Sequence, residues 1–244
     1  MGQGPRRPPR ERTRRRARPR RHGPLQARQR QVIAAEAGLG PLALLDYASV
    51  LIFALTGALV ASRAQLDVVG FAFLACLTAL GGGTMRDLLL DRTVLWIGDP
   101  TYLGVACAAA LLVFFTAHLL ESRYRAILWL DAAALSVAVA AGAGIALEAG
   151  ASWPVILVMG VMTGSLGGLM RDVVANEVPL LLKQGEPYAT CALGGAGALL
   201  AAHATGMTPA GAALICALIT FVLRGGTLAF GWQIPIYKGR PPRN

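Results

Sequence analysis

Two short motifs place charged residues inside long apolar stretches of this 244-residue chain. Residues 81–87 read GGGTMRD and residues 166–172 read LGGLMRD. The four ionisable residues of these motifs are Arg86, Asp87, Arg171 and Asp172. Ionisable side chains at membrane depth are costly, so they generally pair or line a path for ions or polar solutes. The motifs therefore indicate ion or solute passage. We expect no enzyme activity, because no Walker, Rossmann, HExxH or GxSxG pattern occurs.

The glycines that precede each charged pair are the second notable feature. Consecutive glycines cost a helix about 1 kcal/mol each relative to alanine, so each motif is predicted to kink or unwind its helix. Carbonyl groups freed in this way could replace the hydration shell of a cation. Close packing of glycine against a neighbouring helix is the alternative. The candidate path residues are Gly81, Gly82 and Gly83 in the first motif and Gly167 and Gly168 in the second.

The two arginines need partners if they lie within the membrane. Adjacent side chains on a helix do not face each other, so we expect that Arg86 does not neutralise Asp87. Two pairings remain open. Each arginine pairs either with the aspartate of the other motif, or with Asp46 or Asp131, which begin apolar stretches of their own. Asp46 and Asp131 could instead favour a helix dipole or form an acidic vestibule, and the arginines could snorkel to the interface.

The motifs belong to an internal repeat with an offset of 85 residues and no gap. This offset pairs Asp46 with Asp131, Gly57 with Gly142 and Thr78 with Thr163. Each copy contains three apolar stretches, and an odd number of spans inverts the second copy in the membrane. Inverted repeats place substrate or ion sites near a pseudo-two-fold axis in the membrane plane.

Seven apolar stretches are long enough, or nearly so, to cross ~30 Å of hydrocarbon as helices. They are residues 42–62, 66–90, 101–120, 127–148, 153–178, 188–205 and 208–226. The predicted fold is an all-α polytopic membrane protein with a three-helix repeat at 42–120, an inverted three-helix repeat at 127–205 and a seventh helix at 208–226. A C-terminal tail at 227–244 follows.

The net charge of +10 resides in an N-terminal tail. Residues 1–31 carry 12 arginines and one acid, whereas the rest of the chain sums to −1. The tail has almost no large apolar side chain and is predicted to be disordered. A nucleic-acid or anionic-lipid tether is the alternative, but no nucleic-acid partner is expected for the apolar body. Loop charges favour a cytoplasmic C-terminus, because one side of the predicted spans carries Arg63, Arg123, Arg125, Lys183, Lys238, Arg240 and Arg243.

The cysteines and histidines suggest neither a metal site nor a cofactor. Cys76, Cys107, Cys191 and Cys216 lie in apolar runs without paired spacing, so we interpret them as small buried hydrophobic residues. The histidines have no partners at ligand spacing.

The paired glycine–arginine–aspartate motifs in a repeated three-helix pattern resemble those of the bacterial trimeric intracellular cation (TRIC) channels. This family is also labelled the glycine-transporter-type domain family. The resemblance covers about residues 42–226 and implies a homotrimer in the bacterial plasma membrane. Each protomer would hold a water-filled pore for monovalent cations such as K⁺, lined by the second and fifth helices, with a cytoplasmic C-terminus. Leu166 departs from the family pattern, because it stands where a third glycine is expected.

Two functions fit this pattern. The first is passive conduction of K⁺ through each protomer. The second is a carrier for a small solute such as glycine that works by alternating access between the repeats. Membrane lipid is an expected partner of either.

Overall fold

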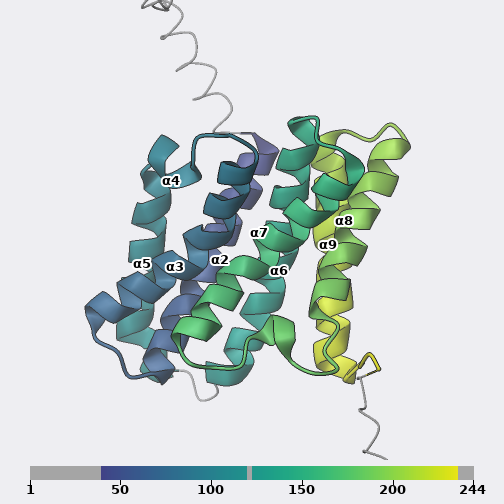
Figure 1. The fold of residues 1–244 in the computed structure, drawn as a ribbon. Coiled ribbons are helices and arrows are strands. Elements are labelled where there is room, and N and C mark those ends of the chain that lie inside the picture. The colour runs from purple at the N-terminus through teal and green to yellow at the C-terminus, as the bar shows by residue number, and fades with distance from the viewer. Residues whose placement is uncertain (1–39, 120–122, 236–244) are drawn as a thin grey trace, which may run out of the picture. The chain divides into compact units, whose positions relative to one another are not determined.

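A computed structural model describes residues 40–119 and 123–235, which fold as α-helices joined by short loops (Figure 1). The first part contains α2 (Pro41–Arg63), α3 (Val68–Leu89), the short α4 (Leu95–Gly98) and α5 (Thr101–Thr116), which a 3₁₀ turn extends to Leu119. The second part contains α6 (Arg123–Glu148), α7 (Trp153–Val174), a 3₁₀ turn (Leu180–Leu182), α8 (Tyr188–Ala204) and α9 (Pro209–Phe230). Neither range contains a strand, so the all-α prediction is confirmed. The arginine-rich tail at 1–31 and residues 236–244 lie outside the described residues.

Local sequence signals explain where several helices begin and end. The Asp67 carboxylate accepts a hydrogen bond from the Gly70 N–H at 2.8 Å and caps the start of α3. Thr208 caps α9 in the same way through the Gly211 N–H, and Pro209 occupies the first turn, where its missing N–H costs nothing. α9 ends at Phe230, and the residue that follows it, Gly231, has a φ of 67° in the left-handed region that glycine tolerates best.

Six helical segments within the described ranges are long and apolar enough to cross a membrane. They are Pro41–Arg63, Val68–Leu89, Thr101–Leu119, Tyr124–Glu148, Trp153–Val174 and Pro209–Phe230. The predicted span at 188–205 corresponds to α8, which has only 17 residues and is about 26 Å long at 1.5 Å per residue. The count of seven spans therefore stays a prediction.

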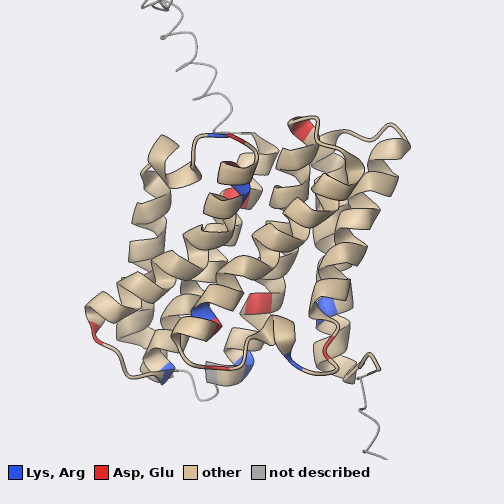
Figure 2. Ribbon diagram, in the orientation of Figure 1, with Lys and Arg blue, Asp and Glu red and all other residues tan. Residues whose placement is uncertain are grey.

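α3 and α7 run in opposite directions through the helical bundle. Figure 1 shows the C-terminal end of α3 near the top and that of α7 near the bottom, with α3 between α5 and α7. One core cluster includes Phe53, Leu74 and Val113, and a second includes Leu135 and Leu199. The charged residues in Figure 2 lie toward the two ends of the helices, whereas the middle of the bundle carries no Lys, Arg, Asp or Glu. This distribution suits a membrane, where hydrocarbon surrounds the middle of each span.

The prediction that all four cysteines are buried is wrong in part. Cys191 and Cys216 are buried, but Cys76 is only half-buried and Cys107 is exposed on α5. An apolar run in a membrane protein faces lipid as readily as it faces the core. Apolar sequence alone therefore does not separate the two environments.

Candidate functional site

The first charged cluster joins the end of α3 to α2. The Arg86 guanidinium is buried and donates from Nη1 and Nη2 to the two Asp46 carboxylate oxygens at 2.9 and 3.0 Å. Its Nε donates to Asp87 Oδ1 at 2.9 Å. The other Asp87 oxygen accepts from the Leu95 backbone N–H at the start of α4, also at 2.9 Å. The bidentate geometry and the extra N–H partner are the features that make a buried ion pair tolerable.

The second cluster repeats this arrangement 85 residues later, between α7 and α6. Arg171 Nη1 donates to Asp131 Oδ1 at 3.0 Å, and Arg171 Nε donates to Asp172 Oδ1 at 2.7 Å. The Leu180 N–H donates to Asp172 Oδ2 at 2.9 Å, as Leu95 does to Asp87. Asp131 differs from Asp46 because its second oxygen accepts from the Tyr188 hydroxyl at 2.9 Å. The repeat therefore extends from the sequence to individual hydrogen bonds.

The structure decides between the two pairings that the sequence left open. Each arginine pairs with the aspartate that begins its own repeat, so the exchange of partners between motifs is wrong. The expectation that Arg86 does not neutralise Asp87 is also wrong. Arg86 Nε reaches one Asp87 oxygen, and the Leu95 N–H at the start of α4 holds the other. Each ionised cluster then has two carboxylates for one guanidinium and a formal charge of −1.

The glycines of the motifs allow close packing and do not unwind the helices. α3 and α7 are each continuous α-helices through their motifs, so the predicted unwinding is wrong. A Cβ atom on Gly82 would lie 2.3 Å from the Thr163 carbonyl oxygen, and one on Gly167 would lie 2.2 Å from that of Thr78. The two contacts are equivalent under the 85-residue offset, and they let the backbones of α3 and α7 meet.

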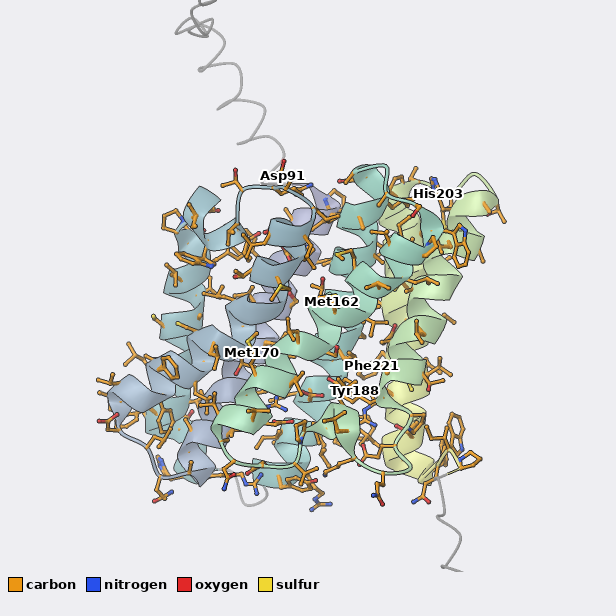
Figure 3. All side chains as sticks on the ribbon, in the orientation of Figure 1. Asp91, Met162, Met170, Tyr188, His203 and Phe221 are labelled. Carbon is orange, nitrogen blue, oxygen red and sulfur yellow. The ribbon has the colours of Figure 1, made fainter. Side chains whose placement is uncertain are left out.

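The remaining motif glycines contact side chains. A Cβ atom on Gly81 would clash with the tip of Met170, and one on Gly83 would clash with Leu95. Figure 3 shows Met170 on α7, beside α3. A Cβ atom on Gly168 would meet Asp131 Oδ1 at 3.3 Å, a tight contact. The glycines thus leave room for neighbouring side chains as well as for the opposite helix.

Two cavities adjoin the clusters. A cavity of only about 10 Å³ lies where α2, α3 and α7 meet, and its lining includes Asp46, Thr78, Gly82 and Thr163. A larger cavity of about 190 Å³ lies beside the second cluster. Its polar lining is Arg63, Tyr124, Arg171, Asp172, Glu177 and Lys183. Along the described chain, no three His, Cys, Asp or Glu side chains gather to hold a metal ion.

A further polar cluster is centred on Asp99, which lies between α4 and α5 and outside the candidate membrane spans. Asp99 accepts hydrogen bonds from the Thr101 hydroxyl at 2.6 Å, from the Thr101 N–H at 3.0 Å and from the Tyr47 hydroxyl. These donors stabilise the carboxylate and lower the pKa of Asp99 below its ordinary value, the Thr101 hydroxyl contributing most. Asp99 therefore stays charged at neutral pH and fixes Tyr47 of α2 to the end of the α4–α5 connection.

Arg224 of α9 is a charged residue that the sequence analysis missed. It is buried, donates from Nη2 to Glu186 at 2.8 Å, and lies 4.8 Å from the ring centroid of Tyr188. Tyr188, labelled in Figure 3, in turn bonds Asp131 and so connects α9 to the second cluster. An arginine inside the apolar run 208–226 was the signal that could have identified it.

Comparison with known proteins reveals relatives that match this chain over most of their own length. A family model described as "Glycine transporter" matches the chain twice, over residues 43–118 and 128–204. The inner membrane protein YadS of Escherichia coli K12 is 35% identical over 199 residues, which cover 79% of this chain and 94% of YadS. A membrane protein of Deinococcus radiodurans is 38% identical over 185 residues, which cover 74% of this chain and 86% of that protein.

Solved structures agree with the sequence matches. The TRIC trimeric intracellular cation channel orthologue from Rhodobacter sphaeroides superposes with a TM-score of 0.75 at 42% identity, over 78% of this chain and 98% of that chain. The chain belongs to the TRIC family. A second prokaryotic TRIC channel, crystallised in 0.5 M KCl, gives a TM-score of 0.73 at 26% identity, over 78% of this chain and 96% of that chain. This TRIC-family chain is therefore a multi-pass bacterial membrane protein, and the two matches to the family model begin 85 residues apart.

Proposed function

We propose that this TRIC-family chain is a monovalent cation channel that conducts K⁺ passively through a path within each protomer. The path would run along α3 and α7, between the cluster at Arg86 and the cluster at Arg171. The observation that carries this proposal is the pair of equivalent buried clusters, each with one more carboxylate than guanidinium. A formal charge of −1 in a low-dielectric environment attracts cations. Arg86 and Arg171 alone would repel K⁺, but the two carboxylates of each cluster outweigh the single guanidinium.

The assembly and topology form part of the same proposal. The two repeats would be inverted around a two-fold axis near the Gly82–Thr163 and Gly167–Thr78 contacts. α8 would be the sixth of seven spans, and the C-terminus would be cytoplasmic. Three copies would form a homotrimer in the bacterial plasma membrane, because solved relatives are described as trimeric cation channels. Light scattering of the purified protein in detergent measures the number of copies directly.

Planar-bilayer recording of the purified protein tests conduction. A channel gives ohmic unitary currents in K⁺ and Na⁺ gradients. A glycine carrier, which the description of the family model suggests, gives saturable glycine uptake into vesicles and no unitary currents. Saturable uptake without unitary currents would therefore replace the channel proposal with the carrier.

One substitution tests the path itself. Thr78 lines the small cavity beside the first cluster, and its hydroxyl donates to the Leu74 carbonyl at 2.6 Å. Thr78→Val keeps the shape but removes the hydroxyl, so we expect a lower unitary K⁺ conductance. Thr116→Val is the matched control, because the exposed Thr116 hydroxyl makes the same kind of bond to Leu112 at 2.7 Å. Equal conductance in the two variants would exclude this cavity from the path.

A further inference from the structure

Two cysteine thiols face each other between α3 and α5. Cys76 Sγ lies 3.8 Å from Cys107 Sγ, and both thiols are free. Cys76 is half-buried and Cys107 is exposed, whereas the other two cysteines of the described chain are buried. We propose that Cys76 and Cys107 are a redox modification site, where a membrane-permeant hydroperoxide forms a disulfide that ties α3 to α5.

The distance between the thiols fits this reaction. A disulfide bond is about 2.0 Å long, so the sulfur atoms must approach by roughly 1.8 Å from their separation of 3.8 Å. Ala75 and Ala106, which precede the two cysteines, are fully buried, whereas the cysteines themselves are more exposed. Rotation of the side chains and a small shift of α3 can share the movement.

The surroundings favour a lipophilic oxidant and a neutral product. An apolar hollow of about 300 Å³ adjoins Cys76, and Leu80, Met85 and Met170 are among its lining residues. A hydroperoxide can enter such a hollow from the lipid. A disulfide carries no charge, whereas two thiolates with a monovalent soft metal ion carry a net charge of −1, which is costly in an apolar region. The pair is therefore better suited to oxidation than to metal binding.

The reaction balances with the hydroperoxide as the only oxidant. The Cys76 thiol, which lines the hollow, attacks the O–O bond, which gives a sulfenic acid and releases the alcohol ROH. The Cys107 sulfur then attacks the sulfenic sulfur, the S–S bond forms and water leaves. Two thiols lose two electrons and two protons in total, and the hydroperoxide is reduced to ROH and H₂O.

The disulfide has a consequence for conduction, and this part rests on the proposed channel function. α5 and α7 lie on different sides of α3 (Figure 1), and Cys76 precedes Gly82 by fewer than two helical turns. Closing the sulfur pair draws α3 toward α5 and away from its contact with Thr163. The cavity of about 10 Å³ at that contact is too small for an ion with its water, so widening it should raise the open probability severalfold.

The first experiment tests the modification site without any measurement of conduction. Full-length protein in lipid nanodiscs is treated with cumene hydroperoxide and analysed by mass spectrometry and by non-reducing gel electrophoresis. We expect a loss of about 2 Da per chain, a peptide cross-link between Cys76 and Cys107, and reversal by dithiothreitol. Cys107→Ala should abolish the cross-link, whereas the matched control Cys191→Ala/Cys216→Ala should retain it.

Several results would overturn the proposal. Three outcomes would each refute the proposed Cys76–Cys107 disulfide site. They are a cross-link between the Cys107 residues of two chains, oxidation to sulfinic acid without a cross-link, and no reaction at all. The second experiment records the oxidised protein in bilayers before and after dithiothreitol. If the cross-link forms but unitary currents stay unchanged or fall, the regulatory step is wrong. If no unitary currents occur even in the reduced protein, the channel proposal fails, while the disulfide site stands on its own.

Discussion

Gly82→Ala is the sharpest test of the contact between α3 and α7. The added Cβ would lie 2.3 Å from the Thr163 carbonyl oxygen, whereas ordinary contacts lie at 3.4 Å or more. The backbones must therefore separate by roughly 1 Å, and overpacking of this kind costs about 1–3 kcal/mol. Because the clash involves backbone, we take the upper end of that range. Alanine recovers about 1 kcal/mol of helix propensity, so the net loss of unfolding free energy is about 2 kcal/mol.

Gly197→Ala is the matched control for this prediction. Gly197 lies within α8, and no atom outside its own helix lies within 4 Å of the added Cβ. It should therefore gain about 1 kcal/mol from helix propensity alone. The two variants then differ by about 3 kcal/mol, or about 6–12 °C in Tm for a chain of this size. Thermal unfolding of both variants in the same detergent, monitored by circular dichroism, measures the difference in Tm.

The double variant Gly82→Ala/Gly167→Ala makes the test stricter. Both added Cβ atoms press on the same interface between α3 and α7, at 2.3 and 2.2 Å from carbonyl oxygens. A single separation of the helices relieves both clashes, so the double variant should lose less than the sum of the two single variants. Equal Tm values for Gly82→Ala and Gly197→Ala would refute the reasoning. So would a double variant whose loss of unfolding free energy equals the sum of the losses in Gly82→Ala and Gly167→Ala.

Three further predictions follow from the charged residues. Asp131→Ala removes one partner of the fully buried Arg171 guanidinium and should cost about 3–5 kcal/mol of unfolding free energy. Glu177→Ala breaks the surface pair with Arg63 and should cost less than about 1 kcal/mol. Chemical denaturation compares the two losses. Arg224→Met removes the cation that pairs with Glu186 at 2.8 Å and lies over the Tyr188 ring, so it should lower the unfolding free energy. An unchanged value in the same denaturation experiment would contradict this reasoning. The lowered pKa of Asp99 gives stability that is present above the ordinary carboxyl pKa and is lost as the pH falls through the lowered value. Asp99→Asn should therefore reduce the fall of Tm at acid pH. If Tm falls as steeply in the variant as in the unmodified protein, Asp99 does not cause the loss of stability.

Much of the fold could be predicted from the sequence. Apolar runs of about 20 residues become helices in a membrane, because each backbone polar group must find its partner within the segment. The offset that relates Asp46 to Asp131 also identified the repeat without any coordinates. Arg224 was missed because it has no counterpart in that repeat, although its position in an apolar run could have marked it.

The pairing within the site could not be predicted, because residue types give no distances between helices. The sequence offered Arg86 two sets of partners, and only the packing of α2 beside α3 brought Asp46 within 2.9 Å. The rule that adjacent side chains diverge on a helix failed at Asp87, where the backbone of α4 holds the carboxylate near the arginine.

The sequence by itself determined that this chain is a repeated, helical membrane protein with paired charges at equivalent positions. Hydropathy and periodicity act locally, so each segment carries its own signal. Only the tertiary structure decided what the motif glycines do, because a glycine serves a helix break and a close helix contact equally well. The choice depends on whether another backbone lies opposite, as the Thr163 carbonyl does for Gly82.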